Sequence, residues 1–135
     1  MQLAFYKAPG NLTDKLIRLA TFGKYSHCEI IFSDGMWFSA DAWNNVCRYK
    51  EEKYFNRDNW DFIEFNCSES VARMFCDRIN GSPYDFRAIL TWFLPDFRDD
   101  RAKWYCSEAC HEALAFPRSR ISPSKLAKKL VNIST

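Results

Sequence analysis

The chain has 135 residues, of which 47% are hydrophobic and 17% aromatic. This composition excludes a disordered tail or linker, and the length suits one domain, so residues 1–135 are predicted to form a single domain with its own core. Basic residues (19) nearly balance acidic ones (17) for a formal net charge of +2. Because these charges are mixed along the chain, no nucleic-acid partner is expected.

The first half of the chain is predicted to be mainly β-structure. A helix at 11–21, capped by Asn11 or Thr13 and stopped by Gly23, follows the first strand. Asp34 and Gly35 supply the turn of a hairpin between the second and third strands. Runs rich in β-favouring residues occur at 2–8, 26–32, 36–43, 46–50 and 60–65.

From Cys67 onward the hydrophobic period becomes helical. One helix ends before Gly81 and Pro83, and a second, 85–95, is capped by Asp85 and closed by Pro95. Two more are expected, from about Cys106 to Phe116 and over 124–130, the latter capped by Ser122 or Ser124. The predicted class is therefore α+β, with an antiparallel sheet of four or five strands in the N-terminal half and mainly C-terminal helices.

Localisation and metal content follow from simpler features. The apolar runs are too short for a transmembrane segment, and the first residues lack the features of a signal peptide, so a cytoplasmic protein is expected. The six cysteines are interpreted as free thiols, of which Cys28, Cys47, Cys76 and Cys110 pack in the core. No paired spacing indicates zinc, and no metal or other cofactor is predicted.

The tripeptide Cys-Ser-Glu occurs twice, at Cys67 and at Cys106, each before a helical pattern. A cysteine nucleophile acts as the thiolate and needs a positive neighbour or a helix N-terminus. The only imidazoles are His27 and His111. If Cys106 starts a helix, His111 lies about 140° around its axis and points away, which excludes it as the partner of Cys106.

His27 begins a predicted strand, and alternation places His27 and Glu29 on one face with Cys28 on the other. Glu29 can orient the ring, although side chains two apart on a strand are not in ideal contact, so it can instead contact substrate. Asp41, at the end of the next strand, is the alternative carboxylate. A lone histidine at a strand start is more commonly a surface or cap residue, and spacing alone does not decide.

Three motifs in order resemble the circularly permuted branch of the NlpC-type papain-like superfamily, in particular the YiiX-like proteins. Tyr25-Ser26-His27-Cys28-Glu29-Ile30 is similar to the histidine strand of that family. Gly81-Ser82-Pro83-Tyr84-Asp85 is similar to its Gly-x-x-Tyr-Asp segment, and Tyr105-Cys106-Ser107-Glu108 to its cysteine helix. The resemblance covers about residues 3–123 and implies a permuted papain-like (NlpC-like) fold in which the histidine strand precedes the cysteine helix.

The resemblance implies Cys106 as nucleophile, His27 as base and then acid, and Glu29 as the residue that orients the ring; Cys67 has no counterpart. Tyr105 either packs at the helix entry or shapes the site. Four further residues are assigned plain roles: Tyr84 a turn, Asp85 a cap, Cys110 packing and His111 the surface.

The implied activity is that of a cysteine hydrolase, an amidase or peptidase acting through an S-acyl enzyme on a peptide amide, such as one from cell wall, or on a lipid-linked amide. The alternative enzyme is a thioesterase or lipid acyltransferase, for which residues 91–97 could line an apolar groove, although such a stretch more commonly packs in the core. A non-catalytic binding module with a buried, inert Cys106 is the alternative of another class.

Overall fold

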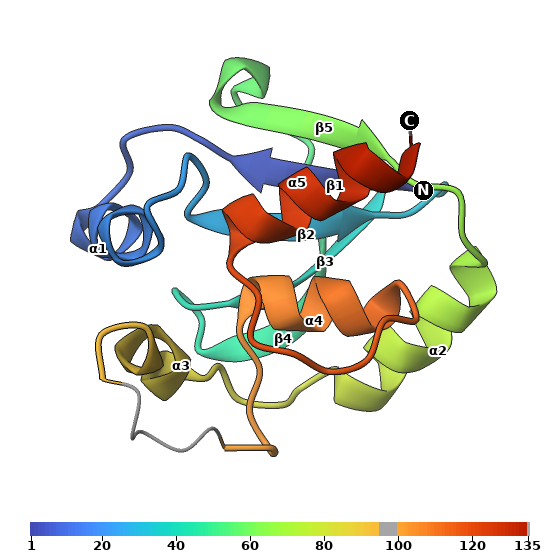
Figure 1. Cartoon of the computed structure of the whole chain (residues 1–135). Helices are drawn as coiled ribbons and strands as arrows, with labels where there is room; N and C mark the ends of the chain where they lie inside the picture. Colours follow the sequence, from blue (N-terminus) through green and yellow to red (C-terminus); the bar gives the residue numbers. More distant parts are fainter. Residues whose placement is uncertain (95–99, 135) are drawn as a thin grey trace.

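A computed structural model describes residues 1–94 and 100–134 and shows one five-stranded antiparallel sheet (Figure 1). The strands lie in the order β4-β3-β2-β1-β5, so the first strand of the chain is flanked by the second and the fifth. Their bounds are β1 (Gln2–Tyr6), β2 (His27–Ile31), β3 (Met36–Asp41), β4 (Val46–Glu51) and β5 (Trp60–Glu64). The predicted α+β class and the sheet in the N-terminal half are confirmed.

Five α-helices and a short 3₁₀ turn, η1 (Arg57–Asn59), complete the described elements of these two ranges. The helices are α1 (Leu12–Thr21), α2 (Glu69–Ile79), α3 (Phe86–Thr91), α4 (Cys106–Ala113) and α5 (Pro123–Ser134). None of the described helices is long and apolar enough to cross a membrane.

Side-chain caps fix several helix starts, as polar residues at these positions predict. Asn11, rather than Thr13, caps α1, where it forms a reciprocal capping box with Asp14. The Asp85 carboxylate accepts the first free N–H groups of α3. At the start of α5 the Ser122 hydroxyl accepts from the Lys125 N–H, which decides between the two serines.

Helix ends were harder to predict. α4 stops at Ala113, before the expected Phe116, because Ala115 takes a left-handed conformation with φ 63°. α3 ends at Thr91 rather than running on to Pro95, which lies outside the described residues. α5 extends to Ser134, beyond the expected residue 130.

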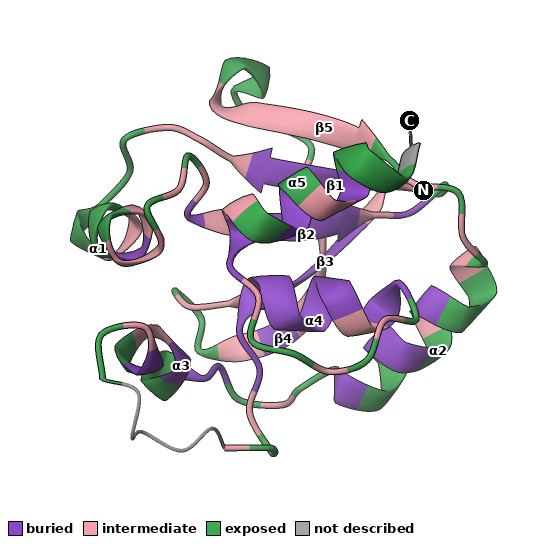
Figure 2. Ribbon diagram, viewed as in Figure 1, coloured by how far each residue is buried: buried purple, intermediate pink, exposed green. Residues whose placement is uncertain are grey.

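Three helices, α2, α4 and α5, cover one face of the sheet, and α1 and α3 lie at one end of it (Figure 1). The central helix is α4, whose residues are buried almost all round (Figure 2). It packs on the face that carries Cys28 and Ile30 of β2 and Phe38 of β3. The N-terminus of α4 is thereby held against the strand that begins with His27.

Candidate active site

Cys106 is the first residue of α4. The preceding residue, Tyr105, has extended backbone and makes no side-chain cap to the helix. The N-cap side chain therefore gives no acceptor to the backbone N–H groups of the first turn, at the positive end of the helix dipole. This environment favours a thiolate at position 106 over a thiol.

An opening between β2 and β3 brings Cys106 to the strand. β2 pairs with β1 over five positions, but with β3 only at Ile30 and Ile31. The N–H of Phe32 donates to β3, at the Met36 carbonyl, and alternation directs the N–H of Cys28 toward the same side. Because β3 does not pair with Cys28, the N–H and the thiol of Cys28 are left to interact with the Cys106 sulfur, which lowers the pKa of Cys106.

His27 joins the thiol to a buried carboxylate. Its Nε2 lies 2.9 Å from Oε1 of Glu29, which leaves Nδ1 as the ring nitrogen available to Cys106. The ring is also close enough to the Cys106 sulfur for the two groups to shift each other's pKa. The predicted pairing of His27 with Glu29 on one face is confirmed, and side chains two apart on this strand are in direct contact.

The electrostatics of the pair match an ion pair of thiolate and imidazolium. The hydrogen bond from the Cys28 thiol, aided by His27, holds the pKa of Cys106 well below its usual range against the opposing effect of burial. Burial alone would lower the pKa of His27, but the Cys106 sulfur and Glu29 outweigh it and raise that pKa. Both shifts favour the charged forms at neutral pH.

Lys50, on β4, is a site residue that sequence reasoning missed. Its Nζ lies 2.9 Å from the same Oε1 of Glu29 that contacts His27, and 2.9 Å from Oε2 of Glu52. Burial raises the pKa of Glu29, but His27 and Lys50 outweigh it and keep the carboxyl ionised. Its second oxygen, Oε2, is buried without a hydrogen-bond partner among the described residues. Nothing in the spacing of Lys50 could identify it, because β4 reaches Glu29 only across β3.

Asp41, the alternative carboxylate, is engaged elsewhere. Its Oδ2 accepts from Arg48 at 2.9 and 3.0 Å, and Oδ1 accepts from the backbone of Trp43. Glu29 is the carboxylate that touches the imidazole in the described structure. Asp41 contributes to the wall of the same cavity instead.

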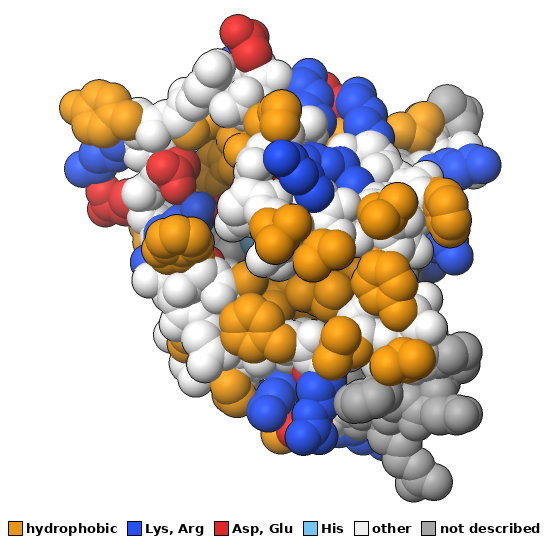
Figure 3. Space-filling view, turned by 90° about the vertical axis from the view of Figure 1, so that its left-hand side faces the viewer, with side chains coloured by type: hydrophobic (Ala, Val, Ile, Leu, Met, Phe, Trp, Pro, Cys, Tyr) orange, Lys and Arg blue, Asp and Glu red, His pale blue; other side chains and the backbone are white. Residues whose placement is uncertain are grey.

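A cavity of about 360 Å³ opens beside the imidazole, and the face on which α1 and α3 lie is hollowed in Figure 3. Aromatic and charged side chains share its wall, among them Glu29, Lys50, Trp60, Tyr84 and Phe86, with His27. Cys106 is not part of that wall and is only 2% exposed. The thiol thus lies behind the imidazole as seen from the cavity.

Tyr105 has a structural role. Its hydroxyl donates to the Ile121 carbonyl at 2.8 Å, and its ring meets Trp92 edge-on at 5.5 Å between centroids. This contact buries Trp92 in part, while Phe93 and Leu94 are exposed; the rest of the predicted groove at 91–97 lies outside the described residues. Asp85 is the predicted cap, whereas Tyr84 is buried and lines the cavity rather than forming only a turn.

His111 is buried at 3% exposure, so the expectation that it lies on the surface is wrong. α4 is enclosed by the sheet, α2 and α5, and even its polar positions point into packed surroundings. Lys129 Nζ lies 2.8 Å from His111 Nε2, and the ring stacks on Phe116. Burial, helped by Lys129, lowers the pKa of His111 and holds the ring neutral. Cys110 is buried, as predicted.

Cys67 lies at the other end of the sheet. It follows β5, whose last residue pairs with Gln2, whereas His27 pairs with Tyr6 at the opposite end of β1. Burial raises the pKa of Cys67, the reverse of the shift at Cys106. The Cys-Ser-Glu at Cys67 therefore lacks the surroundings of a reactive thiol.

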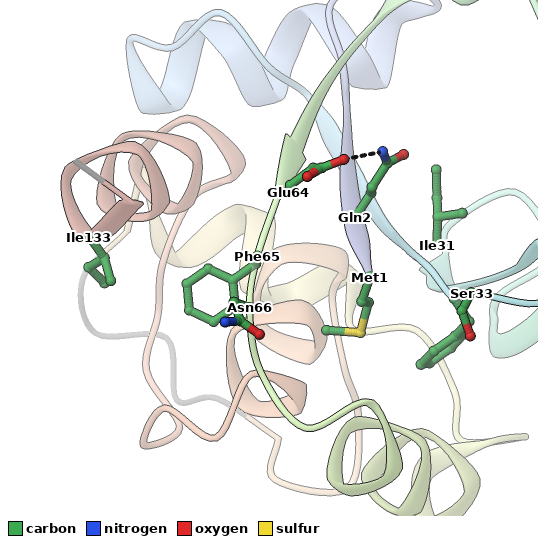
Figure 4. Close-up of a pocket in the computed structure, with 9 residues that line it drawn as sticks. Met1, Gln2, Ile31, Ser33, Glu64, Phe65, Asn66 and Ile133 are labelled. Carbon is green, nitrogen blue, oxygen red and sulfur yellow. Dashed lines mark hydrogen bonds between the residues drawn. The ribbon is translucent and has the colours of Figure 1, made fainter.

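A larger cavity, of about 750 Å³, lies at that same far end and is shown in Figure 4. A hydrogen bond of 3.2 Å between Gln2 and Glu64 spans one side of it. The other lining residues are Met1, Ile31, Phe32, Ser33, Phe65, Asn66 and Ile133. Its wall holds neither a cysteine nor a histidine, so this cavity lacks a nucleophile and a base for cysteine-dependent acyl transfer.

All six cysteines are free thiols. Within residues 1–94 and 100–134, no group of three or more His, Cys, Asp or Glu side chains is placed to hold a metal ion. Neither a known protein family nor a curated protein matches the chain.

Proposed function

We propose that the protein is a cysteine-dependent hydrolase, an amidase or peptidase, with Cys106 as nucleophile. The observation that carries this proposal is the imidazole of His27, which contacts the buried Glu29 on one side and interacts electrostatically with Cys106 on the other. The helix that starts at Cys106, packed on a sheet whose histidine strand comes earlier in the chain, also supports a circularly permuted papain-like fold.

In the proposed reaction the Cys106 thiolate attacks the carbonyl carbon of an amide, and a sulfur–carbon bond forms. The carbonyl electron pair moves to oxygen, where N–H groups at the start of α4 can stabilise the negative charge. His27 then donates its proton to the departing amine as the carbon–nitrogen bond breaks, which leaves an S-acyl enzyme.

Hydrolysis regenerates the enzyme. The now neutral His27 removes a proton from water, and the resulting hydroxide attacks the acyl carbon and releases the carboxylic acid and the thiolate. Glu29 holds the ring in place and stabilises its protonated form throughout. A thioesterase or acyltransferase would share the acyl-enzyme and differ in the leaving group or the acceptor.

The burial of Cys106 favours the second candidate, a binding module that keeps the fold without catalysis. Alkylation by iodoacetamide at pH 6 to 7, followed by peptide mapping, separates the two. The hydrolase predicts that Cys106 is labelled first, because only the thiolate reacts. An unreactive Cys106, or faster labelling of Cys67, favours the binding module.

Substrate class requires a direct readout. Incubation with a panel of peptide amides, esters and lipid amides, followed by intact-mass measurement, is expected to trap an acyl group on the wild-type protein. The same incubation with Cys106→Ser tests the site of attachment, since an adduct that persists in this variant assigns the chemistry to another residue.

A further inference from the structure

Large apolar side chains gather on the end of the molecule that holds the His27 cavity. They come from α1 and the residue after it, from the β3–β4 turn, and from α3 and the residues that follow. The members of this apolar end face are Leu12, Leu16, Leu19, Phe22, Trp43, Phe86, Leu90, Phe93 and Leu94. Figure 3 shows hydrophobic side chains crowding the middle of this face. A gathering of this kind marks an interaction surface.

The helix α1 has its larger apolar stripe facing outward. Leu12, Leu16 and Leu19 recur at i, i+4 and i+7 and are 71, 43 and 64% exposed, whereas Ile17 is the buried residue of α1. The core-facing side of α1, with Asp14 and Ile17, borders the cavity. Packing within the chain therefore explains one side of α1 and leaves the leucine stripe unexplained.

Phe22 strengthens the case for a contact partner. It ends α1 in the left-handed conformation, with φ 48°, and its side chain is 95% exposed. A bulky residue in this conformation carries a backbone cost, and exposure adds a hydrophobic one. Residues with a strained backbone cluster at functional sites, so an exposed, strained Phe22 indicates a contact with a partner outside the chain. Trp43, 85% exposed, lies on a neighbouring turn.

The charges of this face identify the partner. The carboxylate of Asp14 is occupied by the Asn11 N–H and the Ser26 hydroxyl, and that of Asp41 by Arg48. Lys15 is exposed and sits between Leu12 and Leu19 on the helix surface, and Arg18 donates to backbone carbonyls. The guanidinium of Arg18 is thus occupied within the chain, whereas Lys15 forms no ion pair with a carboxylate in the described part of the chain. The outward charge among the leucines is therefore positive.

We propose that the apolar end face docks on an anionic lipid bilayer surface. Leucine and aromatic side chains would enter the boundary between headgroups and acyl chains, while Lys15 would contact the anionic headgroups. Docked in this way, the mouth of the His27 cavity faces the lipid. The inference is independent of the chemistry at Cys106, since it rests on α1 and its neighbours.

Vesicle co-sedimentation tests the proposal with phosphatidylcholine vesicles, with and without phosphatidylglycerol. The wild-type protein is expected to pellet with the anionic vesicles more than with the neutral ones. Leu19→Ser combined with Phe22→Ser should weaken this binding about tenfold or more, because two large apolar groups no longer enter the interface. Met74→Ser, which changes a side chain 72% exposed on α2, is the matched control and should bind as wild type.

Charge is tested separately. Lys15→Glu should weaken binding to anionic vesicles about fivefold or more, at about 1 kcal/mol for each basic residue near the surface. Lys53→Glu makes the same change of net charge away from the face and should have little effect. The proposal is overturned if wild type ignores anionic vesicles or if variants and controls bind alike. A lipid-independent dimer that Leu19→Ser with Phe22→Ser abolishes would instead assign the face to a second copy of the chain.

Discussion

A single carboxylate oxygen of Glu29 contacts two basic side chains. His27 and Lys50 both lie 2.9 Å from Oε1, and the carboxyl group is buried at 2% exposure. Removing either cation leaves a buried carboxylate with half of its charge compensation. We therefore expect Lys50 to be a positioning residue, which would act on Cys106 through Glu29 and His27.

Replacing Lys50 should change the pH dependence of the thiol. In Lys50→Met the buried cluster loses a positive charge, so the pKa of Cys106 should rise and the acid limb of its alkylation profile should move up by about one pH unit. Lys50→Arg should restore the profile. Lys53→Met removes an exposed ammonium and is the control; an unshifted limb in Lys50→Met would show that Lys50 is structural only.

The imidazole should govern thiol reactivity. The pKa of Cys106 is lowered and that of His27 raised, so the ion pair exists between the two pKa values and is lost as pH falls through the first or rises through the second. His27→Ala should raise the pKa of Cys106 and slow its labelling at pH 6 to 7, whereas the contribution of Cys28 to the lowered pKa remains.

Glu29→Gln should lower the same labelling rate about tenfold, because the ring keeps a hydrogen-bond partner but loses the charge that stabilises imidazolium. Asp41→Asn is the comparison, since Asp41 borders the cavity without touching the ring. Thermal unfolding of each variant checks that the fold is intact. A larger loss in Asp41→Asn than in Glu29→Gln would reverse the assignment of the carboxylate.

At the scale of elements, sequence patterns predicted the features that depend on neighbouring residues alone, namely strand alternation and helix caps. Alternation in 26–32 placed His27 and Glu29 on one face, and Asn11 and Asp85 acted as the caps their positions suggest. The end of α4 depends instead on Ala115, which adopts the left-handed conformation although it is not a glycine. The amino-acid type at this position therefore does not predict the helix end. The burial of His111 depended on packing from both sides of α4, which sequence periodicity does not contain.

Two ion pairs on α4 offer a measurable contrast. Glu108 is 1% exposed and accepts from Arg118 Nε at 2.6 Å, whereas Glu112 meets Arg78, whose side chain is 66% exposed, at 3.3 Å. Arg118→Ala should reduce the free energy of unfolding by about 3 kcal/mol, because it removes the arginine partner of a buried carboxylate. Arg78→Ala should cost at most about 1 kcal/mol. Urea denaturation measures both, and equal losses would contradict a special role for the buried pair.

At the scale of the whole molecule, the site joins the beginning of the chain to its end. Motif order could suggest that Cys106 meets His27, but no pattern within either motif contains the opening between β2 and β3 that allows it. The same holds for Lys50, which depends on sheet order, and for the apolar end face, whose members come from α1, a turn and α3. Such features belong to assembled elements, and single-sequence periodicity describes only one element at a time.

Because of the opening between β2 and β3, the backbone amide of Cys28 can report the charge state of the neighbouring Cys106 sulfur. An amide proton that donates to sulfur experiences a different field when that sulfur gains or loses its charge. In an amide-resolved NMR titration, the Cys28 resonance should therefore follow the protonation of Cys106, while the Ile30 amide, paired with β3, stays nearly still. Alkylated protein should show no such movement, so one backbone signal would record the state of the thiol without any substrate.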